Sequence, residues 1–229
     1  MSRIARFVNS SIGAKTLVAL TGAALFLFVI VHMLGNLQIY LGPDALNAYA
    51  KKLKDLPIVL WPARIGLLGI VVVHVVLALR LAAANKSATG RAYESRSTIQ
   101  ATPASLSMVW TGPLIAAFIV YHLLHFTIGA IYPDAFHSVD DQGRHDVYKM
   151  VVLGFRNPLI ALSYIVAMIF LGLHLRHGIA SLFQTLGLRH PAYENLIERS
   201  GLALAWIIVI GNVSIPVSVW LGLVRLPSS

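Results

Sequence analysis

The chain has 229 residues, of which 57% are hydrophobic and only 12% are charged, and its mean hydropathy is +0.75. Soluble globular domains contain about 45–50% apolar and about 25% charged residues, so this composition excludes that class and predicts an integral membrane protein. The absence of cysteine excludes disulfides, iron–sulfur clusters and thioether-attached cofactors. The net charge is +9, and the basic residues fall between the apolar stretches. We therefore expect them to contact lipid headgroups and partner subunits, and we expect no nucleic-acid binding.

Five apolar stretches are long enough to cross a bilayer, which takes about 20 helical residues. Their interiors contain no Asp or Glu, and they cover residues 16–39, 60–84, 104–131, 158–183 and 201–224. A β-barrel is excluded because the apolar runs are continuous and do not alternate. The predicted fold class is therefore all-α, a single domain over 1–229 that forms a bundle of five transmembrane helices.

Two of the connections have recognisable content. The segment 44–55 carries Leu46, Tyr49 and Leu53 at helical spacing, which predicts a short amphipathic helix in the membrane interface. The segment 132–157 is rich in Asp and His and is expected to form a solvated cap.

The distribution of basic residues predicts the orientation. With the N-terminus inside the cell, the inner side carries ten Lys and Arg residues and the outer side carries eight. Since basic residues favour the cytoplasmic side, this small difference predicts a cytoplasmic N-terminus and an outer C-terminus.

Histidines are rare inside membranes and each one is a functional hypothesis. Each of the first four predicted helices carries at least one, and the ligand candidates are His32, His74, His122 and His174. Helix direction places His32 and His122 in the outer half of the bundle, and His74 and His174 in the inner half. Two imidazoles at each of two levels predict two haems b, because such a haem takes two axial nitrogens and no covalent attachment.

An internal repeat supports this pairing. His32 precedes Pro43-Asp44-Ala45 by the same interval at which His122 precedes Pro133-Asp134-Ala135. The second and fourth helices match less closely: Pro57 lies 17 residues before His74, and Pro158 lies 16 residues before His174. The chain therefore resembles a duplicated helical hairpin with one additional helix, and the repeat selects His122 over the nearby His125.

Four further residues lie close to the predicted ligands. His125 and His177 follow His122 and His174 by one turn, and Arg80 and Arg176 lie near the inner ends of the second and fourth helices. They are candidates for second-shell contacts or for binding haem propionates. Interhelical hydrogen bonding by the histidines and snorkelling of the arginines to lipid phosphate are the alternatives.

Taken together, these segments resemble a known family. They are Ile30-Val31-His32-Met33-Leu34-Gly35-Asn36, Val72-Val73-His74, Tyr121-His122-Leu123 and His174-Leu175-Arg176-His177-Gly178. Each motif is short, but their order and spacing over most of the chain are similar to the single-subunit dihaem cytochrome b anchor of succinate:quinone oxidoreductases, which include succinate dehydrogenases and quinol:fumarate reductases.

The resemblance implies an electron-carrying subunit in the bacterial cytoplasmic membrane. His32 and His122 would ligate the outer haem, and His74 and His174 the inner one. A flavoprotein subunit would carry the chemistry of succinate, and an iron–sulfur subunit would dock on the inner face near Arg91, Arg96 and Arg189. The quinone would be menaquinone.

Quinone chemistry also requires a group that exchanges protons. The interiors of the predicted helices supply no carboxylate, so Asp55, on the outer side, is the candidate, and family members carry an acid near this place. The alternative for Asp55 is a surface carboxylate beside Lys51 and Lys52.

Two other functions remain open from the sequence. A cytochrome b anchor of a hydrogenase or formate dehydrogenase would share the haems but have different partners. A small transporter or proton channel that uses intramembrane histidines would need no haem, although the absence of Asp and Glu from the helix interiors argues against a proton relay.

Overall fold

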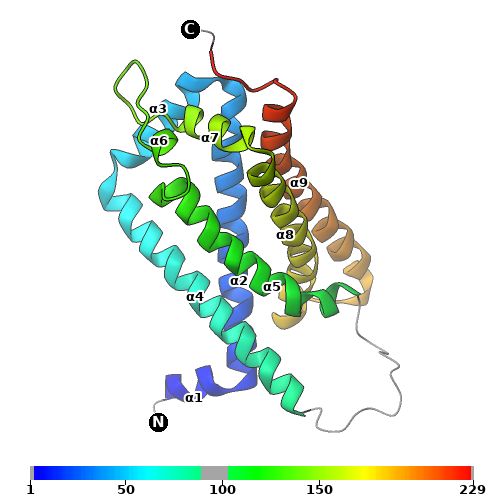
Figure 1. Cartoon of the computed structure of the whole chain (residues 1–229). Coiled ribbons are helices and arrows are strands. Elements are labelled where there is room, and N and C mark those ends of the chain that lie inside the picture. Colours follow the sequence, from blue (N-terminus) through cyan, green and yellow to red (C-terminus); the bar gives the residue numbers. More distant parts are fainter. Residues whose placement is uncertain (1–2, 89–102, 228–229) are drawn as a thin grey trace.

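The structure, a computed structural model, describes residues 3–88 and 103–227 (Figure 1). Arg91 and Arg96, predicted to face a partner subunit, lie outside these ranges. Over the described residues the fold is helical, and its β-structure is one isolated bridge between Val139 and His145. The all-α prediction is therefore confirmed.

Five helices are long and apolar enough to cross a membrane, which confirms the prediction of a multi-pass membrane protein at this level. The long helices are α2 (Ser11–Asn36), α4 (Pro57–Ala88), α5 (Pro103–His122), α8 (Pro158–Thr185) and α9 (Glu194–Trp220). The shorter elements are α1 (Arg3–Asn9), the 3₁₀ turn η1 (Leu37–Leu41), α3 (Pro43–Lys54), the π-helical turn η2 (Leu123–Ile128), α6 (Pro133–Phe136), α7 (Val147–Arg156) and the 3₁₀ turn η3 (Pro191–Tyr193).

Four of the long helices form a group around a common axis. α2 packs against α4 and α8, α8 packs against α5, and α4 and α5 touch one another only slightly. The order around the group is therefore α4, α2, α8, α5, with α2 opposite α5 and α4 opposite α8. We call the end that carries α3, α6, α7 and the C-terminus the upper end, and the end that carries α1 the lower end (Figure 1).

The fifth span, α9, packs on the outside of this group against α8 and α2. Two glycines allow the close approach. A Cβ added at Gly172 of α8 would lie 2.5 Å from Val209, and one added at Gly211 of α9 would lie 2.5 Å from Met33 of α2. Small residues are the usual means of bringing membrane helices together, and here they attach α9 to the bundle.

The upper end is covered by packed helices. The predicted helix 44–55 is present as α3, but the segment 132–157 also contains α6 and the amphipathic α7, which the sequence reading described only as a solvated cap. Tyr148, Val152 and Phe155 of α7 are buried against α3, α8 and α9. The cap therefore has an apolar core of its own.

Some helix boundaries differ from the predicted ones. The third span was predicted to reach residue 131, but its α-helix ends at His122, continues as the π turn, and stops at Gly129, whose φ is +80°. The fifth begins at Glu194, seven residues before the predicted position, because polar helical turns precede its apolar part. Hydropathy detects the apolar part of a helix and misses such polar extensions.

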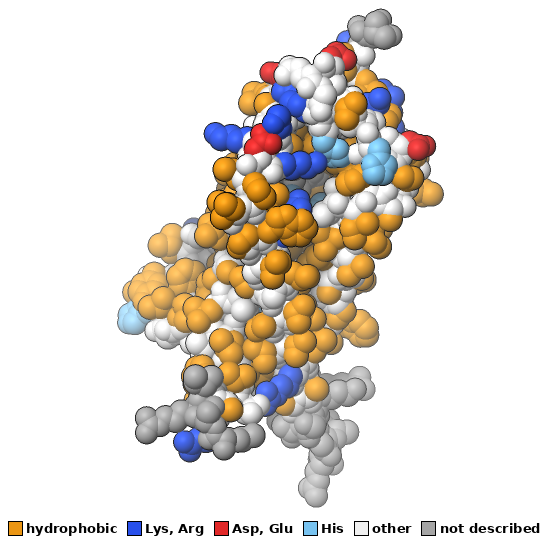
Figure 2. Space-filling model, turned by 90° about the vertical axis from the view of Figure 1, so that its left-hand side faces the viewer, with side chains coloured by type: hydrophobic (Ala, Val, Ile, Leu, Met, Phe, Trp, Pro, Cys, Tyr) orange, Lys and Arg blue, Asp and Glu red, His pale blue; other side chains and the backbone are white. Residues whose placement is uncertain are grey.

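The surface agrees with a membrane protein. Figure 2 shows apolar side chains along the length of one face, with acidic and basic side chains gathered mainly at the upper end. Large apolar side chains of α4, among them Ile58, Trp61 and Ile65, are more than half exposed. Such a surface suits contact with lipid.

Candidate cofactor-binding site

The four predicted ligands form two pairs on the axis of the helix group. His32 of α2 faces His122 of α5, with ring centres 5.8 Å apart, and His74 of α4 faces His174 of α8, with ring centres 6.4 Å apart. Each pair crosses one diagonal of the group. We call His32 and His122 the upper pair, and His74 and His174 the lower pair.

The separations suit two ligands on one metal ion. Two metal–imidazole bonds of about 2 Å in line, with the distance from each nitrogen to its ring centre added, place the ring centres about 6 Å apart. Each pair offers two imidazole nitrogens, and two such nitrogens are the donors that the predicted haem b takes.

Space beside the rings is also available. The four histidines lie within membrane-spanning helices, yet the side chain of each is only partly buried. Partial exposure of these four side chains is compatible with a further group beside them.

The lower pair is held by hydrogen bonds from neighbouring helices. Thr21 Oγ1 of α2 lies 3.1 Å from His74 Nδ1, and Thr111 Oγ1 of α5 lies 3.3 Å from His174 Nδ1. These contacts engage Nδ1 of both rings and leave Nε2 available as the coordinating nitrogen. The sequence reading missed both threonines, although Thr21 and Thr111 are separated by 90 residues, as His32 and His122 are.

The upper pair has aromatic neighbours. Phe28 stacks on His32 with ring centres 5.3 Å apart, and Phe118 lies 5.9 Å from His122. Each phenylalanine precedes its histidine by one helical turn, and the pair again shares the 90-residue offset. The Nδ1 atom of His122 is buried without a hydrogen-bond partner among the described residues.

The upper and lower pairs are separated by the same number of residues along α2 and along α5. Thr21 stands level with His74, and His32 follows Thr21 by eleven residues; Thr111 and His122 have the same spacing. Eleven residues of α-helix rise about 16 Å. Metal ions held by the two pairs would therefore lie about that far apart along the bundle.

His125 has a different environment from the four paired histidines. Its side chain is 1% exposed and belongs to the π turn, which widens the helix directly after His122. Its Nδ1 is 2.9 Å from the hydroxyl of Tyr164, its ring stacks on Phe126, and its Nε2 faces Gly154. This enclosure favours interhelical hydrogen bonding, the alternative considered for His125, over contact with a propionate.

The other three neighbours of the predicted ligands differ in their surroundings. Arg80 donates to the side chain and the carbonyl of Asn9, both at 3.1 Å, and so ties α4 to the end of α1. Arg176 is exposed on α8, and His177 is partly buried one turn after His174. Arg80 is thus engaged with protein, which leaves Arg176 as the arginine open to a propionate or to lipid.

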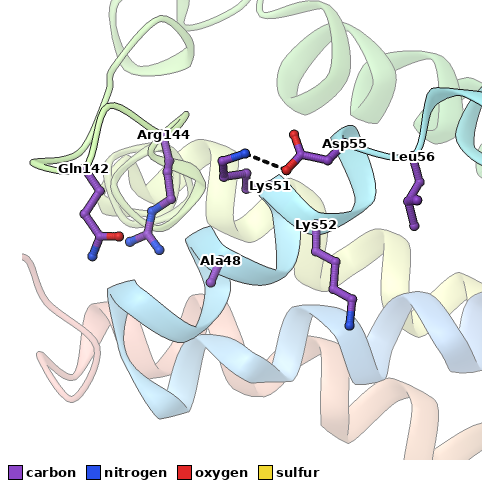
Figure 3. A pocket seen from close by; sticks show the side chains of 7 residues that line it. All are labelled: Ala48, Lys51, Lys52, Asp55, Leu56, Gln142 and Arg144. Carbon is purple, nitrogen blue, oxygen red and sulfur yellow. Dashed lines mark hydrogen bonds and ion pairs between the residues drawn. The ribbon is translucent and has the colours of Figure 1, made fainter.

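Asp55 lies at the upper end, on the wall of a hollow of about 420 Å³. Figure 3 shows Lys51 turned toward Asp55, with Nζ and Oδ2 2.5 Å apart, and Arg144 and Gln142 on the opposite side. This exposed contact with Lys51 is what the alternative for Asp55, a surface carboxylate beside the lysines, leads one to expect. The hollow opens beside the same carboxylate, and the proton-exchange role of Asp55 stays a prediction.

A polar network fixes the loop above this hollow. The buried Asn47 of α3 donates to Asp140 and Asp146, at 3.2 and 2.9 Å, and accepts from the backbone N–H of Tyr148 at 3.0 Å. Arg144 donates to Asp140 at 2.7 Å and to Asp44 at 2.8 Å. These contacts join α3 to the segment before α7.

The same network changes the acidity of its groups. Removal of water raises the pKa of Asp140, but hydrogen bonds from Arg144, Asn47 and Gln142 lower it more, so its pKa lies below the ordinary value. Burial, with the positive charge of Lys54, lowers the pKa of the nearby His145. At pH 7 the network therefore contains an ionised Asp140, and the nearby His145 is neutral.

Comparison of the chain with known protein families, with curated protein sequences and with solved structures gives no match.

Proposed function

We propose that this protein is a membrane cytochrome b in which the upper and lower histidine pairs each bind one haem b. The observation that carries the proposal is the meeting of four histidines from four helices as two diagonal pairs, with ring centres 5.8 and 6.4 Å apart. A bound haem b supplies a one-electron redox couple at its iron. The protein would contribute the imidazole nitrogens of His32, His74, His122 and His174, which four helices hold in place.

We further propose that the chain is the anchor subunit of a succinate:quinone oxidoreductase and connects a peripheral iron–sulfur subunit to menaquinone. The segments around the four histidines, which resemble that family, support this assignment. The spacing of about 16 Å between the two levels suits electron passage along the bundle axis. The lower end is assigned to the cytoplasm, where the iron–sulfur and flavoprotein subunits would dock.

On the lower face Arg189 already has protein partners, because it forms ion pairs with Glu194 and Glu198. The pairs join the segment after α8 to the start of α9 and give that face a fixed shape. Its contribution to docking would therefore come through shape and hydrogen bonding more than through an unpaired charge.

At the upper end we assign quinone proton exchange to Asp55. The hollow beside it is of a size that suits small-molecule sites, and it joins an exposed carboxylate to the outer surface. Asp55 would exchange protons with the quinone, delivering them when the quinone is reduced and accepting them when a quinol is oxidised.

The test is a reduced-minus-oxidised optical spectrum of the purified full-length protein, together with a pyridine haemochrome assay of stoichiometry. Two haems b per chain are expected. One haem per chain would mean that one of the two pairs does not bind iron. A folded preparation without haem, made under haem-replete conditions, would contradict the cytochrome function and favour the alternative of a small transporter or proton channel.

The partner assignment has a separate test. Mild detergent extraction should recover the chain with a flavoprotein that carries covalent flavin and with succinate:quinone reductase activity. Recovery with a nickel- or molybdenum-containing enzyme in place of the flavoprotein would favour the hydrogenase or formate dehydrogenase type of anchor.

A further inference from the structure

We infer that Thr21 and Thr111 are a duplicated positioning element that, with Gly22 making room for one ring, fixes the tautomer and the ring orientation of the lower histidine pair and thereby sets the redox potential of one haem only. The inference rests on the proposed function, because it concerns iron held by His74 and His174. It assigns roles to three residues outside the ligand set.

The proton positions follow from the contacts of Thr21. Its hydroxyl lies 2.6 Å from the carbonyl oxygen of Leu17, and a carbonyl can only accept, so the single hydroxyl hydrogen is directed to Leu17. The oxygen of Thr21 is then free to accept from His74 Nδ1, at 3.1 Å, and the other neighbour of this ring, the carbonyl of Val18, can likewise only accept, so both contacts favour a hydrogen on the histidine nitrogen. With the hydrogen on Nδ1, the lone pair is on Nε2, where a metal ion can bind it.

The glycine that follows Thr21 provides room for the ring. A Cβ at Gly22 would lie 3.2 Å from His74 Cε1, which is a tight contact, whereas a Cβ at Gly112 would lie 3.9 Å from His174 Cε1, which is an ordinary one. At His74, therefore, Thr21 holds one edge of the imidazole while Gly22 leaves the neighbouring edge free. Any larger residue at Gly22 would displace the ring that Thr21 orients.

The sequence repeat supplies an independent observation. Thr21-Gly22 and Thr111-Gly112 share the 90-residue offset that relates Phe28 to Phe118, His32 to His122, and the two Pro-Asp-Ala triplets. Each Thr-Gly pair lies on the first helix of its hairpin and contacts the histidine of the second helix. The same contact thus occurs twice, once in each half of the duplicated unit.

A hydrogen bond from Nδ1 makes the imidazole a stronger electron donor through Nε2. Stronger donation stabilises ferric over ferrous iron and lowers the redox potential. The upper pair has no such contact at His122, whose Nδ1 is without a partner among the described residues. The effect of the threonines is therefore confined to the lower level.

The experiment uses the haem-loaded full-length protein with its partner subunits and compares T21V, T111V, T21S and T16V. Valine keeps the shape of threonine and removes the oxygen, and serine keeps the oxygen. T16V is the matched control, because Thr16 lies on the same helix and bonds to the carbonyl of Ile12 at 3.0 Å as Thr21 bonds to Leu17. The readouts are a redox titration that resolves the two haems and the low-spin ferric EPR spectrum of each.

T21V and T111V should each raise the potential of the same haem and shift its EPR signal, while T21S and T16V match the wild type. The haem that disappears in His74→Ala identifies the lower one. Three results would overturn this inference and leave the proposed function intact. They are two haems with unchanged potentials in T21V, effects of T21V and T111V on different haems, and loss of the lower haem in both T21V and T21S. A wild-type protein without haem would overturn the proposed function and this inference together.

Discussion

The upper and lower histidine pairs have similar geometry and different surroundings. In both, two imidazoles from opposite helices meet with ring centres about 6 Å apart. The lower rings are held through Nδ1 by threonines, whereas the upper rings are bordered by phenylalanines. The pair geometry is therefore a property of the helix arrangement, and the individual character of each level comes from the residues one or two turns away.

The difference has a chemical consequence for any metal ion bound at the two levels. An oriented, hydrogen-bonded imidazole is a better donor than one bordered only by aromatic carbon. Two sites built from the same ligands can thus differ in redox potential without any change in coordination. The following predictions test whether the two levels are separate and whether these contacts distinguish them.

The largest effect is expected from paired removal of ligands. His32→Ala with His122→Ala empties only the upper level and should leave half of the haem, because the lower pair is intact. His32→Ala with His174→Ala takes one ligand from each level and should leave no bis-histidine haem. The pyridine haemochrome assay measures both. Equal haem content in the two double variants would show that the histidines do not pair as the geometry indicates.

A smaller effect should distinguish the two halves of the lower level. Gly22→Ala places a methyl group 3.2 Å from His74 Cε1, so the ring must move by a few tenths of an ångström, whereas Gly112→Ala places it at 3.9 Å, an ordinary contact. We expect Gly22→Ala to shift the redox potential of the lower haem and Gly112→Ala to leave it unchanged. Indistinguishable titrations for the two variants would argue against the tight contact at Gly22.

Tyr164→Phe should affect stability and leave haem content unchanged. The change leaves Nδ1 of the fully buried His125 without its partner, and an unpaired buried polar group costs about 1–3 kcal/mol. Thermal unfolding in detergent should show the loss, with Tyr193→Phe at an exposed position as the control. Loss of one haem in Tyr164→Phe would mean that His125 acts on the upper pair.

The smallest effect is expected on the stability of the loop before α7, at the upper end, when the pH is lowered. His145, whose pKa is lowered, favours the fold above its unfolded pKa of about 6.5, and this stabilisation is lost as the pH falls toward the folded pKa. The pKa of Asp140 is also lowered, so its ionised form stabilises the fold above an unfolded pKa of about 4. This stabilisation is lost as the pH falls through the folded pKa. His145→Gln should remove the first stage of destabilisation, and Arg144→Gln should move the second stage to higher pH. Acid unfolding curves identical to the wild type would show that the loop is not coupled to global stability.

The sequence was sufficient to predict the five apolar helices, because composition and length alone specify a membrane span. It was also sufficient to propose which histidines face each other, because the direction of each helix sets the depth of its residues. The sequence was insufficient to predict α7. Half of that segment is polar, and its apolar residues form a stripe too short to raise the average hydropathy. Val152 and Phe155 had to be seen against α3 and α9 before their burial was evident.

The contacts at the candidate site were only partly predictable. The environment of His125 depends on the π turn, and no pattern in Leu123–Ile128 indicates that turn before the helix is built. The threonines could have been found, since Thr21 and Thr111 repeat at the interval of the histidines. A threonine hydroxyl in a membrane helix usually forms a hydrogen bond with the backbone of its own helix. The additional contact with a histidine becomes evident only when the neighbouring helix is in place.

The duplication has a consequence for how such a molecule could arise. Each hairpin, α2 with α4 or α5 with α8, carries one histidine at each level, so neither hairpin alone can provide two axial ligands at either. Two identical copies of one hairpin, related by a two-fold axis along the bundle, would complete both levels at once. In the present chain the two hairpins occupy the places of the two copies in such a homodimer, and each histidine pair takes one residue from each hairpin.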